Sequence, residues 1–230
     1  MNRFAFLLGL GCALGVWNMG RKEGHAAVIM LACALLGARA GYVWMHWQYY
    51  SLHGWEVFAF SSGGLDGPAA WMGGALAWFC LTLMQRKSFK KALDDSSTLF
   101  IPVLLAIWLG CWVEGVAYGA LLPENSPLGR LNWQSTAAPH WPLPFLAAIG
   151  LVAAFYWLEK RFQFAHDGLR GGLIYLSGLL SLLLISALRS DAPAPLWNGL
   201  RVDIWESLAL FFLFLLAWLL PMAISERKVL

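Results

Sequence analysis

Seven long apolar stretches restrict the fold of this 230-residue chain more than any other feature of its sequence. A helix needs about 20 mostly apolar residues to cross a bilayer. The stretches that meet or nearly meet this length are Phe4–Met19, Ala26–Trp47, Ala69–Met84, Leu99–Leu122, Trp141–Trp157, Gly172–Leu188 and Ile204–Ile224. Charged residues make up only 13% of the chain, whereas soluble domains carry about 25%. We therefore predict an all-α, polytopic membrane protein with seven transmembrane helices, organised as a single domain over residues 1–230.

The basic residues between these stretches predict the orientation of the chain. Eleven of the 16 Lys and Arg residues fall on one side: Arg21, Lys22, Arg86, Lys87, Lys90, Lys91, Lys160, Arg161, Arg170, Arg227 and Lys228. Four fall on the other side, namely Arg3, Arg130, Arg189 and Arg201. Because positively charged loops face the cytoplasm, we predict that the N-terminus lies outside and the C-terminus lies in the cytoplasm.

The segment Tyr49–Pro68 is too interrupted by glycines to cross the membrane. Its tryptophan Trp55, like Trp133 in a later outside loop, is typical of anchoring in the headgroup layer. Asp66 and Pro68 stand where the segment re-enters the membrane. Irregular backbone at that depth must be buried in protein or line a cavity.

Two charged residues, Arg39 and Glu114, lie inside apolar stretches. A charge at membrane depth costs about 3 kcal/mol on insertion scales, so each of them needs a partner. The two could form one structural ion pair that holds two helices together. Alternatively, they could serve a polar cavity that receives a charged headgroup, and the sequence leaves both interpretations open.

Glycines four residues apart flank both charges, at Gly37/Gly41 and Gly115/Gly119, and a third pair is Gly63/Gly67. This spacing favours close approach of helix backbones. It could also make room for an acyl chain.

The remaining polar residues do not form the motifs of a metal, cofactor or nucleic-acid site. Asp203 and Glu206 open the last stretch, where acidic residues suit a helix N-terminus, and we interpret them as capping. The histidines and cysteines show no metal-ligand spacing, and no nucleotide-binding motif occurs, so we predict neither a metal site nor a cofactor. The net charge of +3 is too small to indicate a nucleic-acid partner.

Several motifs resemble the prolipoprotein diacylglyceryl transferase family, over nearly the whole chain. The matching runs are Gly37-Ala38-Arg39-Ala40-Gly41-Tyr42-Val43, Gly63-Gly64-Leu65, Leu109-Gly110-Cys111-Trp112 with Tyr118-Gly119, and Leu188-Arg189-Ser190-Asp191. The resemblance implies a seven-span bacterial inner-membrane bundle. It also implies transfer of a diacylglyceryl group from phosphatidylglycerol to the lipobox cysteine of a prolipoprotein.

The departures from this family fall on its chemistry. The motif histidine of the family corresponds to Pro68 here, its two essential arginines to Trp108 and Leu182, and its glutamate to Ser186. No arginine or lysine occurs between Leu99 and Leu122 that could replace the first of these arginines. The reaction needs a cation at the leaving phosphate and an activated cysteine thiol.

The resemblance therefore leads to two hypotheses. The first is a non-catalytic relative that binds phospholipid or acts as an accessory subunit with other membrane proteins. The second is an active transferase, with prolipoprotein as a partner and Arg39, Glu114 and Arg189 as candidate catalytic residues. The residues expected at a lipid-binding site are Arg39, Gly63, Gly64, Asp66, Glu114, Tyr118 and Arg189.

Overall fold

A computed structural model describes residues 3–60, 63–133, 138–161, 168–190 and 196–226. Within these residues, seven helical segments are long and apolar enough to cross a membrane, which confirms the predicted fold class. The six long helices are α1 Arg3–Met45, α3 Gly67–Met84, α4 Phe89–Glu114, α5 Leu143–Arg161, α6 Leu169–Leu188 and α7 Val202–Glu226. The predicted Arg227, Lys228 and Asp191 lie outside the described residues.

Helix α1 supplies two of the seven spans. Its backbone breaks at Gly20, where φ is 71° and ψ is 176°, a conformation that only glycine adopts without strain. The chain reverses there, and the two halves, Arg3–Gly20 and Glu23–Met45, each qualify as a span. The two expected N-terminal helices are thus joined by a turn at Gly20, followed by the basic residues Arg21 and Lys22 that the sequence places between the two spans.

The fourth span differs from its predicted limits of Leu99–Leu122. Helix α4 begins at Phe89, before the predicted limit. A hydropathy pattern misses this part of the helix because its first turns are polar. It ends at Glu114, since the next residue, Gly115, adopts the left-handed conformation (φ 71°) that closes a helix. The described residues 115–133 and 138–142 lie between α4 and α5 and include η3 Pro127–Leu131.

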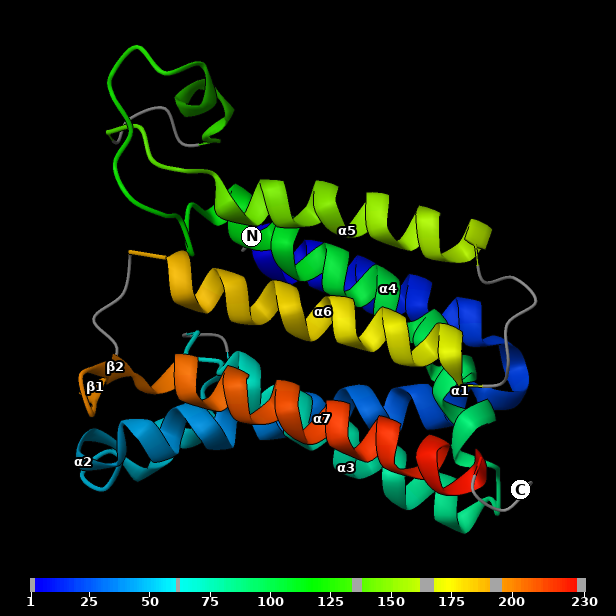
Figure 1. The fold of residues 1–230 in the computed structure, drawn as a ribbon. Helices are drawn as coiled ribbons and strands as arrows, with labels where there is room; N and C mark the ends of the chain where they lie inside the picture. Colours follow the sequence, from blue (N-terminus) through cyan, green and yellow to red (C-terminus); the bar gives the residue numbers. More distant parts are fainter. Residues whose placement is uncertain (1–2, 61–62, 134–137, 162–167, 191–195, 227–230) are drawn as a thin grey trace.

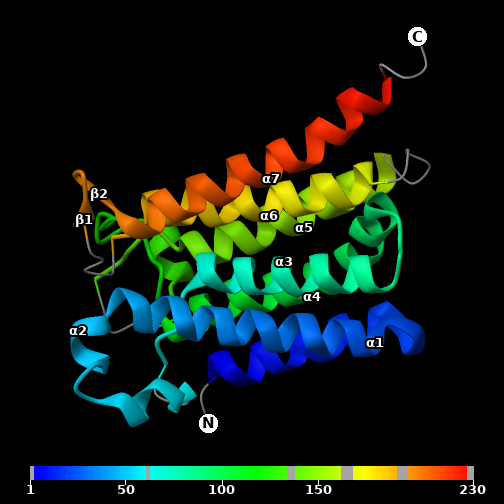
Figure 2. The same ribbon diagram turned by 90° about the horizontal axis from the view of Figure 1, so that it is seen from below.

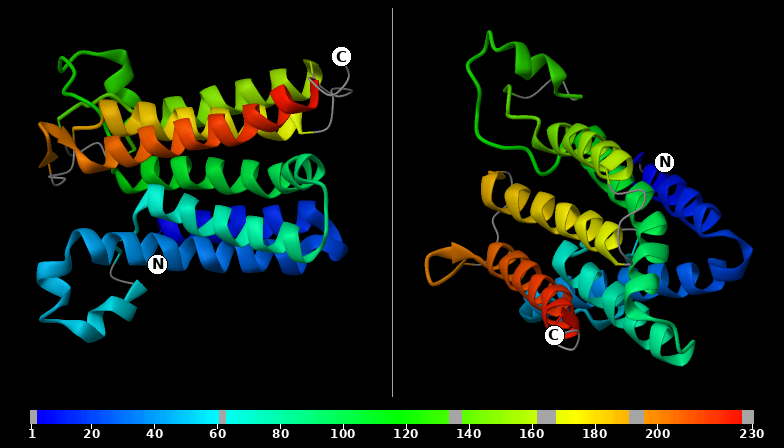
Figure 3. Two further views of the ribbon diagram at one scale, coloured as in Figure 1. Left: turned by 60° about the horizontal axis from the view of Figure 1, so that its bottom comes forward. Right: turned by 45° about the vertical axis from the view of Figure 1, so that its right-hand side comes forward.

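The helices lie roughly side by side, with loops gathered at two ends (Figure 1). At one end are α2 Trp47–Tyr50, η1 Gly54–Phe58 and the hairpin of β1 Leu196–Trp197 with β2 Leu200–Arg201. We name this end, its loops and the segment Tyr49–Pro68 outer, after the orientation that the basic residues predict. The chain begins at this end and finishes at the opposite one (Figure 2), as an odd number of spans requires. Helices α5, α6 and α7 lie together on one side of α4, and α1 with α3 lies on the other (Figure 3).

The glycine pairs do not share one role. At Gly37 and Gly41 a side chain would collide with Ala69, so this pair does let α1 pack closely against α3. Close helix packing is the wrong interpretation for the other two pairs. Gly63 lies in a loop with φ of 82°, and Gly115 is the C-cap of α4.

Candidate functional site

A cavity of about 1570 Å³ lies between both halves of α1 and helices α3, α4 and α6. This volume exceeds the roughly 300–1,000 Å³ of ordinary small-molecule pockets. The lining includes both Phe4 and Gly20, the two ends of the first half of α1, which are separated by about 24 Å at 1.5 Å per residue. The cavity therefore runs through most of the depth of the membrane.

The charged residues of this lining gather at its outer end. They are Asp66, Arg189 and Asp203, and the rest of the lining is mostly aliphatic and aromatic. A long apolar body with one charged end has the shape and polarity of a lipid with its headgroup.

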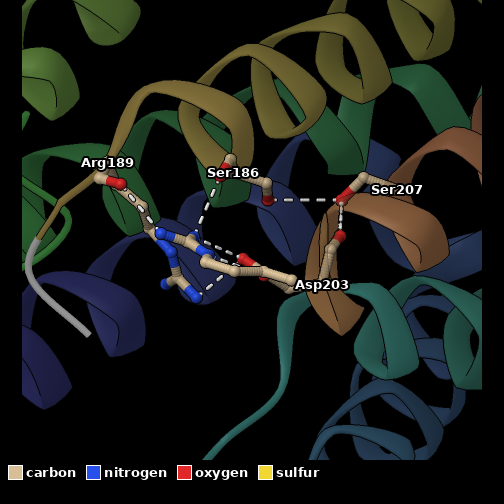
Figure 4. A network of polar contacts seen from close by, with 5 residues as sticks. Ser186, Arg189, Asp203 and Ser207 are labelled. Carbon is tan, nitrogen blue, oxygen red and sulfur yellow. Dashed lines mark hydrogen bonds and ion pairs between the residues drawn. The ribbon is translucent and has the colours of Figure 1, made fainter. Parts of the chain in front are cut away.

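Arg189 and Asp203 form the centre of a polar network at this outer end (Figure 4). Arg189 follows the last turn of α6, and its Nη2 lies 2.7 Å from Oδ2 of Asp203 in the first turn of α7. Arg201 donates to both oxygens of Asp203, at 3.0 and 2.8 Å. It also donates to the backbone carbonyls of Arg189 and Ser186. Two arginines thus hold one carboxylate, and Asp203 does more than cap its helix.

Asp66 lies on the other side of this cavity end, at the start of α3. Its Oδ1 accepts a 2.7 Å hydrogen bond from the backbone N–H of Ala69, so it is the N-cap of the helix. Burial raises the pKa of this carboxyl above its usual range, and the nearby Asp203 raises it further. Glu206 interacts electrostatically with both Asp66 and Asp203. Among the described residues, these carboxylates do not form a group that could hold a metal ion.

Arg39 contacts the backbone of the outer segment instead of the cavity. The side chain is only 3% exposed, and its guanidinium donates to the carbonyls of Glu56, Val57, Gly63 and Gly64. The positive φ values of Gly63 (82°) and Gly64 (74°) turn these carbonyls toward it. Three aromatic rings within 6 Å, those of Tyr42, Tyr50 and Phe60, surround the guanidinium. Arg39 therefore holds the segment that leads to Asp66.

Glu114 has a different partner from Arg39. Its Oε1 accepts a 3.0 Å hydrogen bond from the backbone N–H of Phe4, at the start of α1. A carboxylate at that position satisfies a helix N-terminus. The two intramembrane charges thus contact separate ends of α1, and neither of the contacts described for them is the ion pair that the sequence left open.

Tyr118 lies in the outer loop after α4, where its hydroxyl donates to the carbonyl of Trp112 at 2.9 Å. Burial raises the pKa of this phenol. Its own carbonyl accepts from the N–H of Ser190, just after Arg189. Tyr118 thus positions the outer end of α6, and the lining of the cavity includes Ala117 next to it.

Of the seven residues expected at a lipid site, the structure places Asp66 and Arg189 in the cavity wall. It groups Arg39, Gly63 and Gly64 in one loop contact beside it. Arg201 and Glu206 were not predicted as site residues. The sequence offered one signal for Arg201, its position two residues before Asp203 at the start of a span. A loop arginine beside a capping carboxylate explains this pattern equally well.

The four positions at which the family resemblance implies catalytic side chains all face this cavity. Pro68, Trp108, Leu182 and Ser186 belong to its lining. Trp108 is 4% exposed and its indole N–H donates to Ser181 at 3.2 Å. A buried tryptophan, a leucine and a proline cannot carry a proton or a charge, so this wall is chemically inert at three of the four positions.

Comparison with known proteins agrees with the geometry. A model of the family described as prolipoprotein diacylglyceryl transferase matches residues 1–220. A protein of Enterococcus faecalis, named phosphatidylglycerol–prolipoprotein diacylglyceryl transferase, is 33% identical over 90% of this chain and 82% of its own. A protein of the same name from Lactococcus lactis is 27% identical over 90% of this chain and 85% of its own.

Proposed function

The chain belongs to the prolipoprotein diacylglyceryl transferase family, and we propose that it is a non-catalytic member that binds phospholipid in its intramembrane cavity. One observation carries this proposal. The cavity keeps the length and the polar outer end that suit a lipid, while Trp108, Leu182 and Pro68 replace ionisable side chains in its wall.

The electrostatics of the wall support the same conclusion. A transferase has to stabilise negative charge on a departing phosphate, and this takes preorganised cations in a dry site. Arg189 is the one Lys or Arg among the described residues that line the cavity, and Asp203 already lies against it. Arg39 is the other arginine in the motifs that resemble the family, and its guanidinium donates hydrogen bonds to backbone carbonyls.

The competing function is an active diacylglyceryl transferase that uses a prolipoprotein as acceptor. The names of the relatives from Enterococcus faecalis and Lactococcus lactis favour it. In that case Arg39, Glu114 and Arg189 are the candidate catalytic residues.

We also propose the setting in which the protein works. The distribution of basic residues favours a cytoplasmic C-terminal end, with the cavity's charged end at the outer face of a bacterial inner membrane. Other membrane subunits would contact exposed aromatic side chains at this end, namely Trp44 near the end of α1 and Trp55 and Phe58 of η1, which are 80%, 91% and 72% exposed.

The first experiment tests catalysis. The chain is expressed in cells depleted of their own transferase, and lipidation of a prolipoprotein is followed on gels, with the Enterococcus faecalis relative as positive control. We expect membrane-inserted protein and unlipidated substrate. Lipidation that is lost again with Arg189→Gln would establish the active transferase and overturn the proposal.

The second experiment tests lipid binding. Leu35 lines the cavity, whereas its neighbour Leu36 faces outward and is 60% exposed. Leu35→Trp should reduce the phospholipid that co-purifies with the protein, and the matched Leu36→Trp variant should retain it. Equal lipid content in both variants would show that the cavity does not bind phospholipid.

A further inference from the structure

The polar end of the cavity contains more negative than positive groups. Asp66, Asp203 and Glu206 supply three carboxylates, whereas Arg189 and Arg201 supply two guanidinium groups. These residues interact with one another through ion pairs and through electrostatic contacts. With all five groups ionised, this end of the cavity carries one net negative charge.

The two arginines are not equally engaged. Arg201 binds Asp203 through two of its nitrogens and two backbone carbonyls besides, so it is fixed within the protein. Arg189 reaches Asp203 through Nη2, while its buried Nε has no hydrogen-bond partner among the described residues. Arg189 lines the cavity, so it is the cation positioned to meet a phosphate there.

Asp66 and Glu206 have no ion-pair partner of their own among the described residues. Asp66 lines the cavity, is only 7% exposed and interacts with Arg189 through electrostatics alone. Glu206, which interacts electrostatically with Asp66, has a buried Oε2 without a hydrogen-bond partner in the described part of the chain. A buried carboxylate oxygen is costly unless a positive group compensates it. A ligand that brings its own cation would supply that group.

We propose that this end of the cavity selects a zwitterionic aminophospholipid, with its phosphate at Arg189 and its ammonium at Asp66. This inference rests on the proposed phospholipid binding and specifies the class of lipid. Glu206 adds to the negative potential that the ammonium meets. An anionic headgroup such as phosphatidylglycerol would instead bring a negative charge to a site with three carboxyl groups and two guanidinium groups, and it offers Asp66 no cation.

The test is a competition between headgroups. The full-length protein in detergent receives equal amounts of dioleoyl phosphatidylethanolamine and dioleoyl phosphatidylglycerol, and native mass spectrometry counts each bound lipid. The acyl chains are identical, so the ratio reports the headgroup alone. We expect phosphatidylethanolamine to exceed phosphatidylglycerol by about fivefold, which corresponds to ~1 kcal/mol.

The variants locate the preference. Asp66→Asn with Glu206→Gln should bring the ratio to about one or invert it, since two negative charges are lost. Asparagine remains a good helix cap, so α3 keeps its start. The control Glu124→Gln removes an exposed carboxylate of the outer loop and should leave the ratio unchanged. Because the ratio is counted on folded protein, partial misfolding lowers the total signal without changing it.

The outcomes separate the two proposals. A wild-type ratio of one or below, or a preference that survives the double substitution, would overturn the selectivity for an aminophospholipid while phospholipid binding stands. Absence of both lipids from the wild-type protein, or equal binding by Leu35→Trp, would overturn phospholipid binding itself.

Discussion

The guanidinium of Arg189 and the carboxylate of Asp203 meet at 2.7 Å, joining the last turn of α6 to the first turn of α7. The Asp203 side chain is 8% exposed and that of Arg189 is 27% exposed. The pair stands at the charged end of a cavity that is otherwise mostly apolar. It links the orientation of two helices to the chemistry of the proposed headgroup site.

Replacing Asp203 by asparagine should destabilise the protein substantially. The substitution leaves Arg189 and Arg201 without their shared carboxylate, and breaking such a partly buried pair costs roughly 3 kcal/mol. Thermal unfolding in detergent, followed by tryptophan fluorescence, measures the change. The control is Glu159→Gln, which removes an ion pair with Arg170 whose side chains are 48% and 32% exposed and should cost less than about 1 kcal/mol. Equal effects of the two variants would contradict the central role of Asp203.

Arg39→Lys should loosen the outer segment although the charge is kept. Lysine cannot reach the four carbonyls of residues 56–64 that the planar guanidinium contacts. We expect faster hydrogen exchange in the peptides covering residues 54–66 and little change in α5 and α6. Arg130→Lys, in an exposed part of another outer loop, is the control. Unchanged hydrogen exchange in the Arg39 variant would mean that the segment keeps its conformation without the hydrogen bonds of Arg39.

Gly41→Ala should weaken the contact between α1 and α3. The added methyl group would collide with Ala69 and approach Asp66, and overpacking of this kind costs about 1–3 kcal/mol. Gly9 lies in the other half of the same helix with nothing within 4 Å of a new side chain. Gly9→Ala should therefore be neutral or stabilise by up to about 1 kcal/mol. Differential scanning fluorimetry should show a lower unfolding temperature for Gly41→Ala than for the wild type, and an equal or higher unfolding temperature for Gly9→Ala.

Asp66→Asn should alter stability in a pH-dependent manner. Burial raises the pKa of Asp66 in the folded protein, so the folded state binds this proton more tightly than the unfolded state does. The ionised carboxylate therefore destabilises the wild type at neutral pH, and this cost disappears as the pH falls through the raised pKa toward the ordinary value near 4. Relative to the wild type, the variant should be more stable at pH 8, and its advantage should shrink at pH 4.5. The opposite trend in the two unfolding curves would show that the ionised form is the favoured one.

The seven spans and the family could be predicted from the sequence, because each depends on local composition or on short motifs. Apolar length decides whether a segment can cross a bilayer, whatever its neighbours. The end of α4 was less predictable, since Leu99–Leu122 is apolar beyond Gly115 and the backbone conformation of one glycine stops the helix.

The site depended on how the helices are rotated and how deeply they sit against one another. Arg39 and Glu114 look alike in sequence, as isolated charges in apolar stretches, yet one binds loop carbonyls and the other binds the N-terminus of α1. The loss of ionisable groups at Trp108 and Leu182 was visible in the sequence, but their place in one cavity wall was not. Arg201 and Glu206 come close to the charged end of the cavity only through tertiary packing. The ability to span the membrane is thus a property of each segment by itself. The balance of charge at the end of the cavity arises only when α3, α6 and α7 pack together.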